Sequence, residues 1–313
     1  MNNEIQYVDN VVERVKFSGF GDQFASQIRQ EIAEGKREIY PTTSEQFPLP
    51  KKDQESKAPG QETTADPKST MEYKLEIKVN EDKAFYNGFR GTFTDKDGTQ
   101  RSQWFPANEK ITKREAANML VSDKNPRPVL KHYKDDNNNQ VGVWMQINFS
   151  AKTENNNHVV RRIPEDKERL NYHILDQFSF KETVHDYQKR DTWSQMQKGR
   201  SVEVTPETAS EHKTVFLVAN PLRSTITIED KEGNFLKHDQ FRSPDGKKLH
   251  EEKLQSQISG QGQERQQGTN NNDIQRNQAA QGTANGDDLE ISRKQNPSER
   301  QFREETNNRM SRG

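Results

Sequence analysis

The sequence predicts an α+β protein built from antiparallel sheet units that each follow a short helix. Apolar and polar residues alternate over 73–79 and over 141–149, which is the two-residue period of a half-buried strand. A helix signature over 112–120 precedes the second of these strands. Short turns rich in acids and amides separate the apolar runs, as is typical of antiparallel hairpins. An N-terminal helical hairpin and a disordered C-terminal tail complete the predicted fold.

Residues 1–40 carry two sets of apolar residues at helical spacing on either side of a glycine-rich turn. We expect a helical hairpin, with Asp22 capping its second helix and Gly35 ending that helix. Two short helices with one narrow apolar stripe each are not stable alone, so the hairpin should dock on a partner or on the main body. The side chains predicted to contact a protein partner are the apolar ones of the turn and the second helix: Phe17, Phe20, Phe24, Ile28 and Ile32.

The rest of the chain divides by composition into a linker, a body and a tail. Residues 41–70 are rich in Pro, Thr, Lys and Glu and almost free of large apolar residues, so they predict a flexible linker that leaves the hairpin tethered. The folded body spans 71–238. Residues 239–313 hold only scattered apolar side chains. Such a segment cannot offset its ordering entropy by burial, so we predict a disordered tail.

Local signals place the elements of the body. A second strand runs from Phe85 to Phe93 and turns back at Asp97-Gly98, where glycine takes positive φ without penalty. Thr112 and Glu115 have the spacing of a capping box, in which each side chain satisfies a free backbone donor at a helix start. Further turns are expected at the amide-rich or acid-rich segments 135–140, 155–157 and 230–234.

One order of elements occurs twice: a helix, a break, a strand, and a polar loop before a hydrophobic strand. The first occurrence lies within 71–165 and the second, around Trp193, within 166–238. The residue identities barely match. Two interpretations therefore stay open: a degenerate internal duplication, and independent α+β elements.

Composition limits the classes of protein to which the chain can belong. Hydrophobic residues make up 28% of it, against roughly 45–50% in ordinary globular domains on a count that includes glycine, so part of the chain cannot bury a core. Lys and Arg number 48 and Asp and Glu 49, so nucleic-acid binding would need a local patch of cations. No Cys is present, which excludes disulfides, thiolate metal sites and thiol nucleophiles. The N-terminal residues lack a secretory signal and no apolar run reaches the ~18 residues of a membrane span. We expect a cytoplasmic protein that does not enter a membrane.

Most motifs that would indicate enzyme chemistry are missing from the sequence. Asp245 with Glu251-Glu252-Lys253 imitates the acid, acid and lysine set of a magnesium nuclease, but it lies in the polar tail and not on adjacent strands of a sheet. The seven His residues never pair at the i, i+2 or i, i+4 spacing of metal ligands. The Gly19-Phe20-Gly21 string lacks the preceding strand and the third glycine of a phosphate loop, and no Gly-x-Ser-x-Gly nucleophile motif occurs. We therefore expect a non-enzymatic protein with no catalytic residue, no metal, no cofactor and no small-molecule substrate.

Several bases lie beside strands and aromatic residues and are candidates for nucleic-acid contacts. Cations of this kind bind phosphates, and neighbouring aromatic rings can stack on bases. The alternative is a solvated sheet face on which Glu and Asp balance the bases. The candidates are Lys131, Arg161, Arg162, Lys189 and Arg190.

Several phrases of the sequence carry a resemblance to a known family: VERVKFSGFGDQFASQIRQEI, FYNGFRGTFTDKDG, KITKREAANML, VGVWMQINF, and KGRSVEV followed by VFLVANPLRSTITIED. Over roughly residues 5–229 the chain is similar to an uncharacterised protein family, a domain of unknown function, carried by conjugative elements and plasmids of Bacteroidetes. Its members begin with a similar GFG helical hairpin and a linker. The chain departs from the family at Asn125-Pro126-Arg127-Pro128, where members have Gly-Arg before a strand; the two prolines enforce an extended path.

The resemblance implies a role in a mobile genetic element and supplies no catalytic residue. The sequence therefore predicts a non-enzymatic interaction or accessory protein of such an element, which docks a protein partner through its hairpin. The alternative is an accessory DNA-binding protein in conjugative transfer or plasmid replication.

Overall fold

A computed structural model of the chain describes residues 2–47, 69–80, 83–207 and 213–264. Contacts divide the chain into two units, Met1–Ile258 and Ser259–Gly313, and the first holds the strands described below. The helices are α1 (Asn2–Val15), α2 (Ala25–Ala33), α3 (Lys113–Leu120), α4 (Asp186–Gln197) and α5 (Pro244–Glu264). The strands are β1 (Glu38–Ile39), β2 (Thr42–Gln46), β3 (Thr70–Asn80), β4 (Lys83–Thr94), β5 (Gln100–Pro106), β6 (Val129–Lys134), β7 (Gln140–Lys152), β8 (His158–Pro164), β9 (Val202–Val204), β10 (Val215–Asn220) and β11 (Thr225–Glu229). These helices and antiparallel sheets confirm the predicted α+β class.

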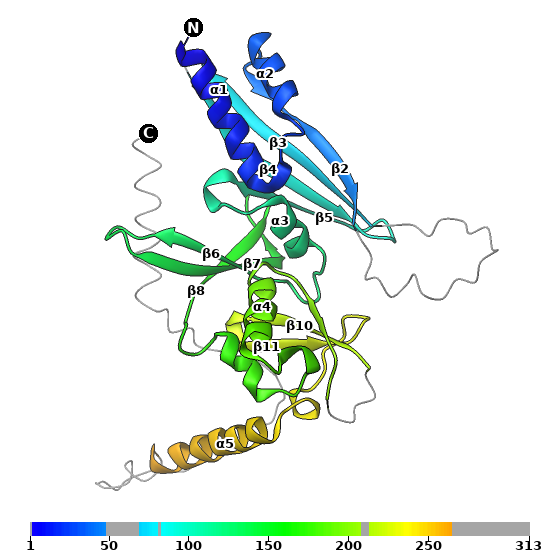
Figure 1. The fold of residues 1–313 in the computed structure, drawn as a ribbon, viewed down its shortest axis with the longest axis vertical. Coiled ribbons are helices and arrows are strands. Elements are labelled where there is room, and N and C mark those ends of the chain that lie inside the picture. The colour runs from blue at the N-terminus through cyan, green and yellow to red at the C-terminus, as the bar shows by residue number, and fades with distance from the viewer. Residues whose placement is uncertain (1, 48–68, 81–82, 208–212, 265–313) are drawn as a thin grey trace, which may run out of the picture. The chain divides into compact units, whose positions relative to one another are not determined.

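Strands β1 to β5 form the largest sheet, in the order β1-β3-β4-β5 with β2 also paired to β3. Alternate residues of β3, from Met71 to Ile77, are fully buried, whereas those between them point to the other face. Helices α1 and α2 lie over the buried face (Figure 1). Val15, Phe20 and Ile28 from the hairpin share one apolar core with these strand residues. The hairpin and the sheet therefore form one domain.

This arrangement corrects the prediction of a hairpin tethered by a flexible linker over 41–70. Residues 42–46 of that range form strand β2, which pairs with β3 along its whole length. β1 and β2 lie on either side of the predicted boundary at residue 40, and both pair with β3. The polar sequence of β2 gave no sign of this, because an edge strand with one neighbour needs few apolar residues. Residues 48–68 of the predicted linker lie outside the described residues.

Of the two predicted helix ends in the hairpin, one is confirmed and one is wrong. Gly35 follows α2 with a φ of 77°, and its N–H donates to the carbonyl of Ile32 at 2.9 Å, as in a glycine C-cap. Asp22 does not cap α2: the N-cap residue is Phe24, without a side-chain hydrogen bond. Asp22 instead pairs with Lys16.

A β-bulge in β4 decides which of its aromatic side chains reach the core. The register between β3 and β4 shifts beside Gly88, whose φ is 139°. A Cβ atom at this position would lie 2.2 Å from the carbonyl oxygen of Phe105, so only glycine fits. Beyond the bulge the side-chain alternation is reversed. Tyr86 and Phe89 are consequently buried, and Phe85 is 41% exposed on the opposite face.

The loops at four hairpin tips have the same five-residue conformation. The first residue's N–H donates to the fifth residue's carbonyl, and the fourth residue's N–H donates to the first residue's carbonyl. The fourth residue has positive φ, which Gly and Asn tolerate better than other residues. These fourth residues are Gly98, Asn138, Asn156 and Gly233. The four predicted turns are therefore confirmed.

Helix α3 begins at the predicted capping box. The Glu115 N–H donates to Thr112 Oγ1, and the Thr112 N–H donates to the Glu115 carboxylate at 2.8 Å. At its other end, the guanidinium of Arg101 donates to the carbonyls of Leu120 and Val121 at 2.7 and 3.0 Å. Side chains thus form hydrogen bonds with free backbone groups at both ends of this eight-residue helix.

Strands β6, β7 and β8 form a meander whose two faces join different cores. Val129 and Met145 pack in the core of the large sheet, together with α3. Leu130 and Trp144 pack in a second core, in which the Trp144 ring meets Trp193 of α4 edge-on at 5.9 Å. Strands β9, β10 and β11 form another meander that follows α4 and belongs to this second core.

A helix followed by a three-stranded meander thus occurs twice, in the predicted order. The predicted boundary between 165 and 166 does not separate the cores, because Leu130 and Trp144 belong to the second one. The duplication itself stays a prediction. The second core also extends beyond residue 238, since Phe241 is fully buried in it. Residues 265–313 of the predicted tail lie outside the described residues.

Candidate functional site

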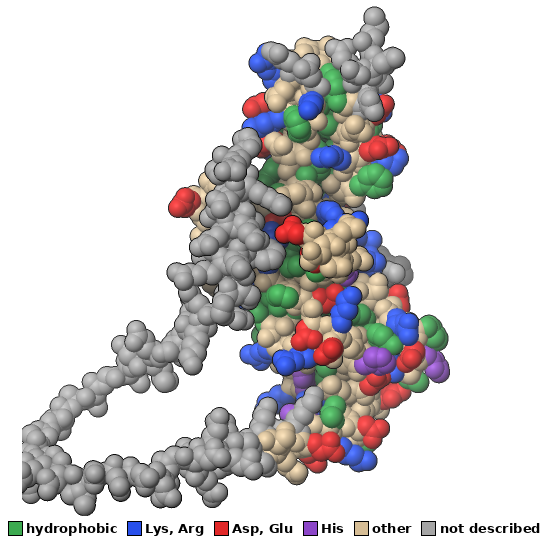
Figure 2. Space-filling view, turned by 90° about the vertical axis from the view of Figure 1, so that its left-hand side faces the viewer, with side chains coloured by type: hydrophobic (Ala, Val, Ile, Leu, Met, Phe, Trp, Pro, Cys, Tyr) green, Lys and Arg blue, Asp and Glu red, His purple; other side chains and the backbone are tan. Residues whose placement is uncertain are grey.

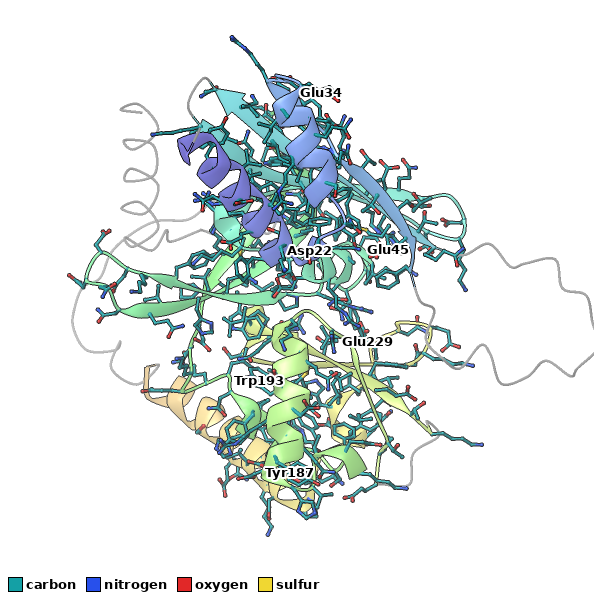
Figure 3. The ribbon with its side chains drawn as sticks, turned by 45° about the horizontal axis from the view of Figure 1, so that its top comes forward. Asp22, Glu34, Glu45, Tyr187, Trp193 and Glu229 are labelled. Atoms are coloured by element: carbon teal, nitrogen blue, oxygen red, sulfur yellow. The ribbon has the colours of Figure 1, made fainter. Side chains whose placement is uncertain are left out.

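The turn between α1 and α2, residues 16–22, is the part of the predicted docking surface that remains accessible. We call it the Phe17 turn. The Phe17 side chain is 79% exposed, the largest exposed fraction among the large hydrophobic side chains that the described residues expose. Figure 3 shows Asp22 where α1 and α2 meet. An aromatic ring is thus presented to solvent at a defined place in the fold.

Buried neighbours hold this turn in place. Phe20 is 4% exposed, and its ring meets Tyr73 at 5.5 Å and Phe89 at 5.2 Å, both edge-on. Gly19 has a φ of 91°, and a Cβ atom there would lie 3.4 Å from the Cβ of Lys113. The positive φ favours glycine, and a Cβ atom here would come into van der Waals contact with α3.

A charged group under the turn ties three elements together. The ammonium of Lys113 in α3 lies 2.7 Å from a carboxylate oxygen of Glu45 in β2, which Figure 3 labels beside the turn. Tyr73 donates its hydroxyl to the same carboxylate at 3.0 Å. The ammonium also lies 5.9 Å from the centre of the Phe20 ring. Burial, assisted by the charge of Glu45, raises the pKa of Tyr73 well above its usual range.

The turn's outer side is polar around Phe17. Lys16 and Asp22 form an ion pair at 3.1 Å, and both side chains are more than half exposed. Ser18 donates its hydroxyl to the carbonyl of Arg14 at 3.0 Å, which extends the hydrogen bonding of α1 into the turn. An exposed aromatic ring with a polar rim has the composition of a small interface centre.

The other predicted docking residues lie in the core and are not available to a partner. Phe20, Phe24 and Ile28 are buried, and Ile32 is half-buried against the same core. The chain's own sheet covers the apolar stripe of these helices, which is the usual fate of an amphipathic face. Of the five predicted docking residues, only Phe17 is therefore exposed to a partner.

Three of the five candidate nucleic-acid-binding cations already have carboxylate partners. Lys131 lies 2.7 Å from Glu115, and both side chains are nearly buried. Arg162 pairs with Glu109, whose pKa is raised by burial although the charge of Arg162 opposes this shift. Lys189 pairs with Asp176, and this hydrogen bond raises the pKa of the ammonium.

Arg190 lies against Tyr172, with the guanidinium 4.8 Å from the ring centre and a hydrogen bond of 3.0 Å to the hydroxyl. Only Arg161 among the five is exposed and has no such partner within the described residues. The candidates also come from different elements, β6, β8 and α4, and Arg161 and Arg162 point to opposite faces of β8. They do not form one basic surface. Figure 2 shows basic and acidic side chains interspersed on the face that it presents.

Sequence reasoning missed Lys74 and Arg90 on the large sheet. They lie directly opposite each other on β3 and β4, on the face away from α1 and α2. Lys74 belongs to the string Glu-Tyr-Lys-Leu-Glu-Ile-Lys, whose charged residues look like an ordinary solvated strand face. The strand register, which no local pattern supplies, was needed to bring the two cations together.

No protein-family model matches the chain, and neither a curated protein nor a solved structure matches it. Within the residues that the structure describes, no three His, Cys, Asp or Glu side chains are grouped so as to hold a metal ion. The described helices also include none that is both long enough and apolar enough to span a membrane.

Proposed function

We propose that the protein is a non-enzymatic interaction protein that docks a protein partner through the Phe17 turn. The observation that carries this proposal is the 79% exposure of Phe17 on a turn whose neighbour Phe20 is locked into the core. The family resemblance favours an accessory role in a mobile genetic element. We place the protein and its partner in the cytoplasm.

The geometry favours docking because little conformational entropy would be lost when a partner binds this turn. Burying a Phe side chain contributes about 1.5–3 kcal/mol. The turn is already ordered, because Gly19 packs against α3 and Phe20 packs in the core. Binding therefore costs little further backbone entropy. The expected partner therefore offers an apolar pocket of the size of one aromatic ring, with polar groups around it.

The alternative, an accessory DNA-binding protein that uses the five predicted cations, has weaker support. Four of the five are engaged with carboxylates or with Tyr172. Moving them onto phosphates would break contacts that the fold already makes.

Affinity capture from the host tests the proposal. We expect wild-type protein to retain a partner that Phe17→Ser loses, while the melting temperatures of the two proteins agree because the side chain is exposed. Phe235→Ser is the matched control, since Phe235 is 62% exposed elsewhere on the fold. Equal capture by wild type and Phe17→Ser would rule out docking through this turn.

A further inference from the structure

The face of the large sheet that points away from α1 and α2 has its own chemistry. Its side chains are exposed or half-exposed, since the burial of β3, β4 and β5 alternates along each strand. We call it the outer face. Across it, the strand register aligns one residue from each of four strands in a single row: Thr42, Lys74, Arg90 and Trp104.

This row places two cations side by side. Residues directly opposite on neighbouring strands have Cα atoms about 5 Å apart, and like charges at such positions destabilise a sheet. Neither Lys74 nor Arg90 has a carboxylate within ion-pairing distance among the described residues. The fold thus keeps an unfavourable pair of positive charges where a bound anion would relieve the repulsion.

Acidic side chains on the same face have other partners or lie off the row. Glu38 accepts the hydroxyl of Tyr40 at 2.9 Å, and Glu76 accepts the side-chain amide of Asn87 at 2.8 Å. Glu72 lies opposite Thr92, one row away from the cations. Glu72 and Glu76 thus lie in the rows on either side of the cation pair, and no carboxylate lies in the row of Lys74 and Arg90 itself.

Aromatic rings flank the cation pair. The Lys74 ammonium lies 5.0 Å from the centre of the Tyr40 ring, which is 43% exposed. Trp104 lies directly opposite Arg90 and is half-buried, so only part of its ring faces solvent. In the adjoining row Thr92 and Ser102 present hydroxyls 3.0 Å apart. Cations, aromatic rings and hydroxyls on an open sheet match the needs of a nucleic-acid strand: phosphate contacts, stacking and hydrogen bonds.

We propose that the outer face binds single-stranded nucleic acid, with a backbone phosphate between Lys74 and Arg90 and a base stacked on Trp104 and another on Tyr40. Stacking of this kind requires bases that are not already paired, and a broad sheet does not enter the grooves of a duplex. The site is independent of the Phe17 turn and uses none of the cations expected from the sequence.

Fluorescence anisotropy of the full chain with labelled oligonucleotides of about 15 nucleotides, at about 50 mM salt, tests the proposal. Single-stranded DNA and RNA of one base type form two arms, and duplex DNA forms a third. We expect binding in at least one single-strand arm and weaker binding to the duplex. Single-strand binding should also quench tryptophan fluorescence. The quenching would report on Trp104, because Trp144 and Trp193 are buried.

The decisive variant is the double substitution Lys74→Gln and Arg90→Gln. It should weaken single-strand binding at least ~10-fold and reduce the salt slope of log K by about 0.7, the value for one phosphate on a single strand. Its melting temperature should equal or exceed that of wild type, because a repulsive pair is removed. Trp104→Thr should weaken binding by roughly 10-fold through loss of stacking.

Arg161→Gln and Phe17→Ser are the controls and should bind as wild type does. Three results would overturn the proposal: no single-strand binding at low salt, equal binding by the double variant, or a preference for duplex DNA that Arg161→Gln abolishes. A failure of this kind leaves the Phe17 docking proposal unaffected, since that proposal is read out by protein capture.

Discussion

At the scale of single residues, two glycines determine how the neighbouring side chains are placed. Gly88 shifts the register of β4, so Phe85 faces out and Tyr86 faces in. Gly142 leaves room for the Glu165 side chain, which a Cβ atom would meet at 2.1 Å. Such positions show as isolated glycines in the sequence, but their purpose depends on what packs against them in three dimensions.

Tyr86 gives a prediction about pH. Burial raises its pKa to about 12, against about 10 in an unfolded chain, so the folded protein favours the neutral hydroxyl. The stabilising contribution is complete below pH 10 and is lost as the pH rises through 12. Between about pH 9 and pH 11 the wild type should lose about 1.3 kcal/mol of unfolding free energy from this group.

The Tyr86→Phe variant has no group to ionise at this position, so it should lose less stability over the same range. Urea unfolding of both proteins at the two pH values measures the difference. Contributions from Tyr73, whose pKa is also raised, are present in both proteins and cancel. An identical pH dependence in the two proteins would show that Tyr86 ionises as freely in the folded state as in the unfolded one.

At the scale of elements, local signals were sufficient where a single turn or helix end determines the structure. The capping box of α3, the glycine that ends α2 and the four hairpin tips are set by residues close together in the sequence. Contacts between distant residues could not be read in this way. The partners of the predicted cations come from elsewhere in the chain: Glu115 for Lys131 and Glu109 for Arg162.

The ion pair between Lys131 of β6 and Glu115 of α3 gives a prediction about stability. Their side chains are 13% and 11% exposed, and the same carboxylate also caps α3. Replacing Lys131 with Met leaves a buried carboxylate without its cation. The unfolding free energy should fall by about 3–5 kcal/mol, measured by urea denaturation.

Lys134→Met is the matched control, because Lys134 is exposed on the same strand. It should change stability by no more than about 0.5 kcal/mol. Adding Glu115→Gln to Lys131→Met should restore part of the loss, because a neutral amide still suits the capping position. A loss of the same size for Lys134→Met would mean that general charge effects, rather than this pair, stabilise the junction.

At the scale of the molecule, the hairpin and the sheet share one core, which changes the site available to a partner. Sequence reasoning found the hairpin and its apolar stripe but placed the stripe against a partner. The stripe instead packs against the chain's own sheet, and strand β2 adds residues that looked like a linker. Phe17 stands out only once Phe20, Phe24 and Ile28 are seen to point inward.

Photo-crosslinking from position 17 tests whether the Phe17 turn docks a protein partner. A photoreactive phenylalanine analogue is placed at Phe17 in one protein and at Phe235, also exposed, in another. On illumination in the host, we expect one covalent protein adduct from position 17 that is missing from position 235. Unlabelled wild-type protein should compete for this partner, and Phe17→Ser protein should not. No adduct from position 17, or the same adduct from both positions, would contradict docking through the Phe17 turn.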